Sequence, residues 1–184
     1  PLKSHKPKNQ HQPTSNNKPG TRTLPHVHPP PEIIAKYPDM NLLAFDTSTE
    51  RLSIAVQRGT RQWQHEGVGG RHSSTALIPE SMELLDAAGL RLRDLDVIVF
   101  GRGPFTGLRT ACSVAQGLAL GADLQVLPLD TLLAVAEQAR MAHGTEQVLA
   151  LLDARMGQVY AAPWCWSTGE GWRLAGTTVV CAPE

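Results

Sequence analysis

Residues 42–50 read Leu-Leu-Ala-Phe-Asp-Thr-Ser-Thr-Glu, which predicts a buried strand that ends in an acidic turn rich in hydroxyls. Residues 97–109 read Val-Ile-Val-Phe-Gly-Arg-Gly-Pro-Phe-Thr-Gly-Leu-Arg, which predicts an apolar strand, a glycine-bearing turn and the start of a helix. The strand at 97–100 has no polar alternation, as is typical of a strand covered on both faces. Many α/β folds build a polyphosphate cleft from such a strand end facing a glycine turn before a helix.

The segments around these stretches alternate between strand and helix patterns. A hairpin of two short strands follows the first stretch, and a helix that ends at Gly89 comes next. The second stretch leads into a helix rich in small residues, a short strand, and a helix capped by Asp130 and terminated by Gly144. The sequence predicts strands at 53–57, 61–66 and 125–127, and the first two helices at 74–88 and 106–121.

The strand pattern restarts at Gln147. Residues 148–153 predict another apolar strand that ends in aspartate, and residues 158–162 follow as its hairpin mate. The arrangement of strand, aspartate turn and strand therefore occurs twice, at Asp46 and at Asp153. We predict two related halves: a complete first domain at 40–145, and at 146–184 the truncated beginning of a second domain.

Residues 1–39 differ in composition from the rest of the chain. They hold nine of the 14 prolines, four of the seven histidines and every lysine. This segment carries six basic and two acidic residues, whereas the body carries eleven basic and fifteen acidic ones, so the two excesses cancel in the net charge of zero. We predict a disordered extension, because so few apolar residues cannot offset the entropy of ordering.

Several classes of function are disfavoured by the body of the chain. No apolar run approaches the roughly 18 residues of a membrane span, and no leader pattern is present. The three cysteines are scattered and show neither a disulfide framework nor a zinc pattern. The arginines form no basic stripe of the kind that binds nucleic acid. These features favour a cytoplasmic protein with no membrane contact.

The motifs, taken in order, resemble the bacterial tRNA threonylcarbamoyladenosine biosynthesis family TsaB (also called YeaZ), the non-catalytic paralogue of the transferase TsaD. The resemblance covers residues 40–184 and implies an α/β fold of the actin-like (ribonuclease H-like) class, with a mixed sheet and flanking helices. The motifs that carry it are Asp46-Thr47-Ser48-Thr49, the helix entry from His72-Ser73 to Leu77-Ile78-Pro79, the turn at 101–109, Gln116-Gly117-Leu118-Ala119, and the stretch from Leu152 to Tyr160.

The turn at 101–109 departs from the family pattern. The family usually reads Gly-Arg-Gly-Pro-Gly-(Ser or Ala)-Phe-Thr-Gly-(Leu or Val)-Arg, whereas here Phe105 follows Pro104 directly and two small residues are missing. A shorter turn offers fewer free backbone N–H groups and loses the residue best able to adopt a positive φ. We therefore expect a weakened phosphate cradle.

The resemblance implies a scaffold rather than a catalyst. The family acts in adding threonylcarbamoyl to the adenosine next to the tRNA anticodon, by binding TsaD as a heterodimer together with the ATP-hydrolysing component TsaE. The chain itself is then expected to need no cofactor, because ATP, Mg²⁺ and a metal ion belong to the partner subunits, which also make most of the tRNA contacts. The helical His-x-x-x-His metal pair of TsaD is absent from this sequence.

The resemblance also implies that the helices at 74–88 and 106–121 form the partner interface. The same surface could close a homodimer when TsaD is absent. The small residues of the second helix leave two interpretations open, namely close packing on the chain's own sheet or close approach of a partner helix. The predicted interface residues are Leu77, Leu84, Leu85, Ala111, Ala115 and Leu118.

An alternative is an actin-like phosphotransferase or ATPase. In that hypothesis Asp46 positions a hydrated Mg²⁺ or the attacking group, the hydroxyls of residues 47–49 donate to phosphate, and Arg109 neutralises charge. The competing interpretation is that Asp46 and its neighbours only satisfy local backbone groups. The candidate vestigial phosphate site comprises Asp46, Thr47, Ser48, Thr49, Gly101, Gly103, Thr106, Gly107 and Arg109.

Overall fold

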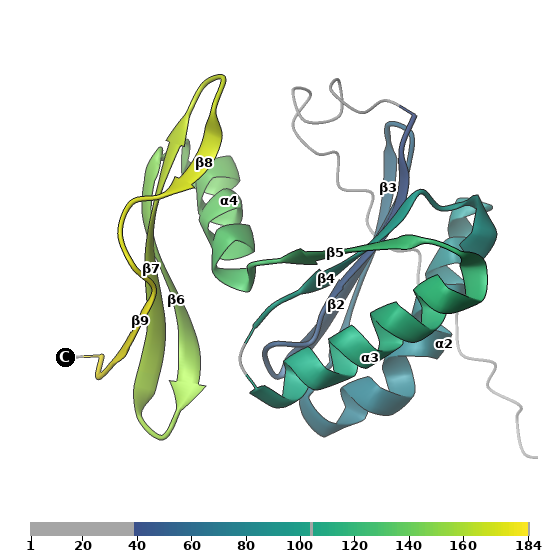
Figure 1. Ribbon diagram of the computed structural model, residues 1–184, viewed down its shortest axis with the longest axis horizontal. Helices are drawn as coiled ribbons and strands as arrows, with labels where there is room; N and C mark the ends of the chain where they lie inside the picture. The colour runs from purple at the N-terminus through teal and green to yellow at the C-terminus, as the bar shows by residue number, and fades with distance from the viewer. Residues whose placement is uncertain (1–38, 104, 184) are drawn as a thin grey trace, which may run out of the picture.

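The computed structural model describes residues 39–103 and 105–183. The predicted disordered extension therefore lies outside the described residues, apart from Asp39. Pro104 and the side chains of Phe105 and Thr106 also lie outside them. Two sheets stand side by side with one helix between them, while two further helices cover the outer face of the first sheet (Figure 1).

The first sheet is mixed and has five strands in the order β3-β2-β1-β4-β5. The hairpin strands pair antiparallel with β1, whereas β4 and β5 run parallel to it. This arrangement confirms the predicted mixed α/β sheet with flanking helices. The strands are β1 (Asn41–Asp46), β2 (Arg51–Arg58), β3 (Arg61–Val68), β4 (Val97–Gly101) and β5 (Gln125–Leu129).

Two helices, α2 (Ser73–Ala88) and α3 (Phe105–Ala122), pack on one face of this sheet. The sheet residues on that face are buried, among them Leu43, Phe45 and Ile98. Gly89 ends α2 in the left-handed conformation, with φ of 67°, which glycine adopts without steric cost. Two short 3-10 turns, η1 (Gly70–His72) and η2 (Leu92–Asp94), precede and follow α2.

The predicted partner interface requires a correction. Five of its six side chains are buried in the core between the helices and the sheet, and Leu118 is partly buried against the same core. The prediction selected the main apolar stripe of each helix. In a surface helix this stripe packs on the helix's own domain, so it is not available to a partner. The side chains not available to a partner are Leu77, Leu84, Leu85, Ala111 and Ala115.

The second sheet is antiparallel, with the order β6-β7-β8 and β9 also paired to β7. Its core joins Leu132 and Ala136 of α4 to Ala150, Ala162 and Trp164 of the strands. The new elements are α4 (Thr131–His143), β6 (Gln147–Arg155), β7 (Gln158–Ser167), β8 (Gly171–Leu174) and β9 (Val179–Cys181).

Packing thus assigns α4 to the second sheet, although the sequence-based boundary after residue 145 grouped it with the first. Asp130 caps α4 as predicted, because its side chain accepts a hydrogen bond from the Leu132 N–H at 2.8 Å. Among the described residues, no helix is both long enough and apolar enough to cross a membrane.

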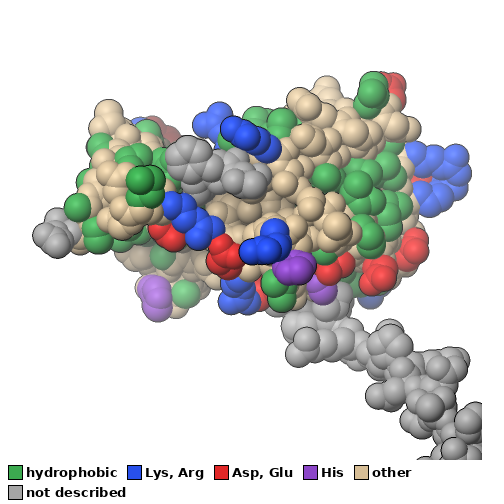
Figure 2. Space-filling model, turned by 90° about the horizontal axis from the view of Figure 1, so that it is seen from below, with side chains coloured by type: hydrophobic (Ala, Val, Ile, Leu, Met, Phe, Trp, Pro, Cys, Tyr) green, Lys and Arg blue, Asp and Glu red, His purple; other side chains and the backbone are tan. Residues whose placement is uncertain are grey.

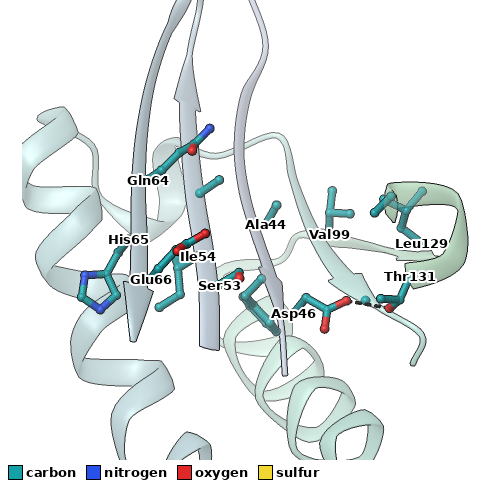
Figure 3. Close-up of a pocket in the computed structure, with 14 residues that line it drawn as sticks. Ala44, Asp46, Ser53, Ile54, Gln64, His65, Glu66, Val99, Leu129 and Thr131 are labelled. Atoms are coloured by element: carbon teal, nitrogen blue, oxygen red, sulfur yellow. Dashed lines mark hydrogen bonds between the residues drawn. The ribbon is translucent and has the colours of Figure 1, made fainter. Parts of the chain in front are cut away.

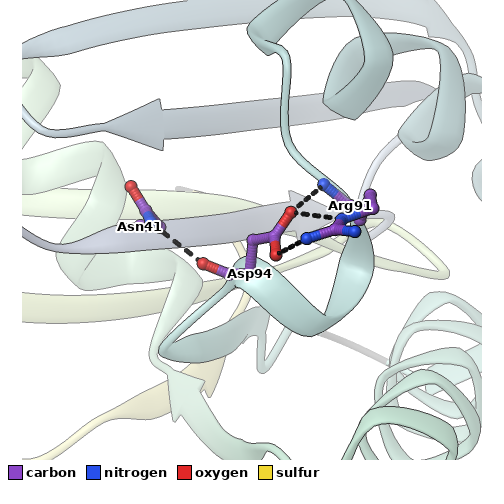
Figure 4. A network of polar contacts seen from close by, with 3 residues as sticks. All are labelled: Asn41, Arg91 and Asp94. Atoms are coloured by element: carbon purple, nitrogen blue, oxygen red, sulfur yellow. Dashed lines mark hydrogen bonds and ion pairs between the residues drawn. The ribbon is translucent and has the colours of Figure 1, made fainter.

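A polar clasp ties η2, the turn after α2, to the start of β1 (Figure 4). The Arg91 guanidinium donates to both carboxylate oxygens of Asp94, with N···O distances of 2.9 and 2.8 Å. The Asn41 side-chain amide donates to the Asp94 carbonyl at 2.9 Å. The hydrogen bonds from the Arg91 side chain, followed by its backbone N–H, lower the pKa of Asp94 to about 2.

We predict that Asp94→Asn destabilises the protein at neutral pH. The clasp stabilises the fold fully above the unfolded pKa of about 4 and is lost as pH falls through 2, because the folded pKa is the lower one. Urea denaturation of both proteins between pH 2 and 7 should show the difference shrinking below pH 4. The exposed Glu83→Gln controls for loss of a surface charge, and a pH-independent difference would contradict the prediction.

Candidate functional site

The carboxyl ends of the parallel strands β1, β4 and β5 meet at one edge of the first sheet. Parallel strands place their ends together, so Asp46, Gly101 and the start of α4 converge there (Figure 3). The structure therefore brings the stretches 42–50 and 97–109 into direct contact. The predicted cleft residues lie at the ends of β1 and β4, in the turns that follow them and at the start of α3, and the Thr106 side chain lies outside the described residues.

A chain of hydrogen bonds links the Asp46 turn to α4. The Thr131 hydroxyl donates to Asp46 Oδ2 at 2.6 Å, and the Ser48 Oγ lies 3.1 Å from Thr131 Oγ1. Because Thr131 uses its proton toward the carboxylate, Ser48 is the donor in the second contact. The backbone N–H of Ser48 donates to the other oxygen, Asp46 Oδ1, at 2.6 Å. Both carboxylate oxygens therefore have partners within the chain.

The other two hydroxyls of the turn are also engaged. Thr47 is buried and its hydroxyl donates to the Gly107 carbonyl at 2.7 Å. The Thr49 oxygen accepts from the Arg51 N–H at 3.1 Å. All three hydroxyls thus satisfy groups of the protein itself, which is the local role that short polar side chains commonly play in turns.

The glycines of the facing turn allow this close contact. A Cβ at Gly101 would overlap the Asp46 carboxylate, and one at Gly103 would overlap the Ser48 side chain. A Cβ at Gly107 would overlap the Thr47 carbonyl oxygen. Glycine is used where backbones must approach closely, and here the group approached is the chain's own turn. The side of the glycine turn that faces Asp46 is therefore filled by the chain's own atoms.

Two hollows flank the closed turn. The first, of about 220 Å³, lies on the sheet face opposite α2 and α3, over small apolar side chains such as Ala44, Ala55 and Val99 (Figure 3). The second, of about 460 Å³, lies between the two sheets and is lined by Arg102, Arg109 and Tyr160, among others. Arg109 is exposed and borders the second hollow rather than the first.

Catalytic and metal-ligating groups are sparse in the described part of the chain. No group of three or more His, Cys, Asp or Glu side chains there could hold a metal ion. His65 Nε2 lies 3.0 Å from Glu80 Oε2, but the pair lacks hydrogen-bond alignment. The hydrogen bonds at Asp46 hold two segments of the chain together.

Sequence reasoning missed Thr131, which joins Asp46 to α4. The available signal was its position, since it directly follows the Asp130 cap at the end of the third parallel strand. The sequence does not reveal the strand order, in which β4 lies between β1 and β5. Without that order, Thr131 after β5 cannot be placed next to Asp46 at the end of β1.

Comparison with known proteins relates the chain to one group. Residues 58–168 match the family described as TsaD, tRNA N6-adenosine threonylcarbamoyltransferase. The chain is 40% identical over 156 residues to the tRNA threonylcarbamoyladenosine biosynthesis protein TsaB of Haemophilus influenzae, and 37% identical over 147 residues to that of Escherichia coli. A solved structure, YeaZ from Pseudomonas aeruginosa, superposes with a TM-score of 0.73 at 42% identity.

The coverage of these matches is partial. Each of the three includes 79% of this chain. The chain spans 66% and 64% of the length of the two TsaB proteins and 68% of the YeaZ chain. The likeness to YeaZ agrees with the predicted actin-like fold and extends across both sheets.

We predict opposite effects for two glycines of α3. Gly107→Ala should lower the free energy of unfolding by about 1–3 kcal/mol, because its methyl group overlaps the Thr47 backbone. Gly117→Ala should raise it by up to about 1 kcal/mol, because no atom lies within 4 Å of the added Cβ and alanine favours helix. Urea denaturation compares the two, and equal effects would show that the turn is not closely packed.

We also predict that the isolated chain does not bind Mg·ATP at micromolar concentrations. The carboxylate and hydroxyls that would hold the metal and phosphates already bond to one another. Isothermal titration calorimetry measures this directly, with Thr131→Val, which frees Asp46 Oδ2, as a comparison. A micromolar dissociation constant for the unsubstituted chain would support the ATPase hypothesis instead.

Proposed function

Because the chain belongs to the TsaB (YeaZ) family of tRNA threonylcarbamoyladenosine biosynthesis proteins, we propose that it is a non-catalytic scaffold subunit for this modification. The assembly adds threonylcarbamoyl to the adenosine next to the tRNA anticodon. One observation carries the scaffold role: the cleft between Asp46 and the glycine turn is closed by the protein's own hydrogen bonds. A subunit whose own cleft is closed would contribute to the modification by binding its partner subunits.

The partners proposed for this chain are TsaD, as a heterodimer, and the ATP-hydrolysing component TsaE. In this proposal ATP, Mg²⁺ and a catalytic metal ion are held by those subunits, which also make most of the tRNA contacts. The location proposed is the cytoplasm, where tRNA is modified. The absence of a basic stripe from the body supports the assignment of tRNA contacts to the partners.

The docking surface proposed for TsaD is the outer face of α2 and α3. Leu120 is 89% exposed and Ile78 43% exposed on this face. A Cβ at Gly117 or Gly121 would meet no atom within 4 Å, so these glycines leave open space beside Leu120. Figure 2 views the molecule from the side on which α2 and α3 lie, where hydrophobic side chains gather on the surface. The exposed Leu120 and Ile78 thus take the place of the buried side chains that were predicted from the sequence to form the interface.

The geometry of this face suits a helix from the partner. Two glycines four residues apart lie on one side of a helix, so a second helix can approach closely along them. The adjacent Leu120 can then insert between partner side chains as a buried anchor. An equivalent face on a second copy would compete, so a homodimer is proposed for the chain without TsaD.

The test is complex formation with TsaD from the same organism. We expect Leu120→Glu to weaken binding at least about tenfold, because a charge is then buried at the centre of the interface. Leu149→Glu is the matched control, since Leu149 is also an exposed leucine but lies on the second sheet. Size-exclusion chromatography and calorimetry give stoichiometry and affinity.

Two outcomes would contradict the proposal. Absence of any complex between the unsubstituted chain and TsaD would remove the scaffold function. Normal binding by Leu120→Glu together with loss of binding by Leu149→Glu would move the interface to the second sheet while leaving the function in place.

A further inference from the structure

The turns at the ends of β1 and β6 touch one another across the gap between the two sheets. Arg155 Nη2 forms an ion pair with Glu50 Oε1, although the residues are 105 positions apart in the chain. Glu50 belongs to the turn between β1 and β2, and Arg155 is the last residue of β6. The pair therefore joins the rims of the two halves.

The backbone of the turn between β6 and β7 directs the Arg155 side chain toward Glu50 of the first sheet. Arg155 and Met156 have φ of 66° and 56°, values that non-glycine residues rarely adopt. The register of β6 against β7 shifts between Asp153 and Arg155, and such bulges redirect side chains. The Asp153 carboxylate accepts a hydrogen bond from the Arg155 N–H at 2.7 Å and holds this conformation.

The backbone of Glu50 is also held in place. The main-chain carbonyl of Glu50 accepts a hydrogen bond from the Gly69 N–H at 2.8 Å, which fixes the turn against the entry to α2. Gly70 has φ of 63°, and a Cβ there would come within 2.7 Å of Glu50 Oε2. Glycine therefore leaves room for the carboxylate to extend toward Arg155. The backbones of Glu50 and Arg155 are thus both held by hydrogen bonds, which reduces the entropy lost when their side chains pair.

A second set of contacts connects the halves at a different place. Thr131, the first residue of α4, bonds to Asp46 and Ser48 directly after the end of β5. Thr131 is buried, whereas the side chains of Glu50 and Arg155 are 70% and 62% exposed. The hollow of about 460 Å³, with Arg102, Leu152 and Tyr160 in its lining, also lies between the halves. The buried Thr131–Asp46 contact is suited to act as a hinge between the halves. The exposed Glu50–Arg155 pair connects them at the surface.

We propose that the Glu50–Arg155 pair is a latch that holds the two halves in a closed arrangement. Breaking it allows the second sheet and α4 to rotate about the β5–α4 connection at residues 129–131. That rotation widens the hollow between the sheets and changes the surface available to any partner that contacts both halves.

The strength of the latch suits a switch rather than a permanent bond. Exposed ion pairs are weak and are screened by salt, so losing one changes an equilibrium by no more than about fivefold. Among the described residues, no strand of the first sheet packs closely against a strand of the second. A small change at the rim can therefore shift the population of open and closed arrangements.

Single-molecule fluorescence energy transfer on the full chain tests the latch. Dyes are placed at Ser113→Cys on α3 and Thr168→Cys after β7, both exposed positions, after replacement of the three native cysteines. We expect Glu50→Gln and Arg155→Gln each to raise the population with the wider separation about two- to fivefold. The charge-swapped Glu50→Arg/Arg155→Glu protein should return it toward the original value.

The matched control is Arg51→Gln, which breaks the equally exposed Arg51–Glu66 pair within the first sheet and should leave the distribution unchanged. High salt should open the unsubstituted protein and have no further effect on Arg155→Gln. Identical distributions for the unsubstituted, Glu50→Gln and Arg155→Gln proteins would overturn the proposal, as would equal opening by Arg51→Gln. Far-UV circular dichroism confirms that each variant is folded, and Glu50→Asp supplies a milder substitution if Arg155→Gln does not fold.

Discussion

The hydrogen bond from Thr131 to Asp46 is the contact on which the arrangement of this molecule depends. It joins the end of the central strand of the first sheet to the first residue of the helix that supports the second sheet. It can form only because β1, β4 and β5 run parallel and end at the same edge. The glycines at 101 and 103 keep the intervening turn close enough, since a methyl group at either position would displace a partner.

This contact also decides what the cleft can do. A carboxylate and hydroxyls at the end of a strand can hold a metal and phosphates, or they can hold the protein's own segments, and each oxygen has a limited number of partners. Here the second use predominates, with Thr47, Ser48 and Thr49 all engaged within the chain. The polar centre at the carboxyl edge of the sheet therefore serves to hold the chain's own segments together.

Much of the fold follows from local patterns in the sequence. The caps and terminators at Asp130, Gly89 and Gly144 set the helix ends correctly, because each acts through its own backbone geometry. The partner interface predicted on α2 and α3 was wrong. The apolar stripes of these helices, which include Leu77 on α2 and Ala115 on α3, face the sheet of their own domain. A stripe shows that a helix is buried on one side but not what buries it. Thr131 and the placement of α4 likewise depend on strand order, which spacing along the chain does not reveal.

The two aspartate turns show how one local motif acquires two roles. Asp46 and Asp153 each accept a hydrogen bond from the N–H two residues later, at 2.6 and 2.7 Å. Asp46 is partly buried and receives Thr131 as a further partner, whereas Asp153 is exposed and its turn projects Arg155 outward. The Asp46 turn thus contacts α4 through the buried Thr131. The Asp153 turn contacts the first sheet through the exposed pair of Arg155 with Glu50. The same local hydrogen bond, from an aspartate to the N–H two residues later, therefore occurs in both turns that connect the sheets.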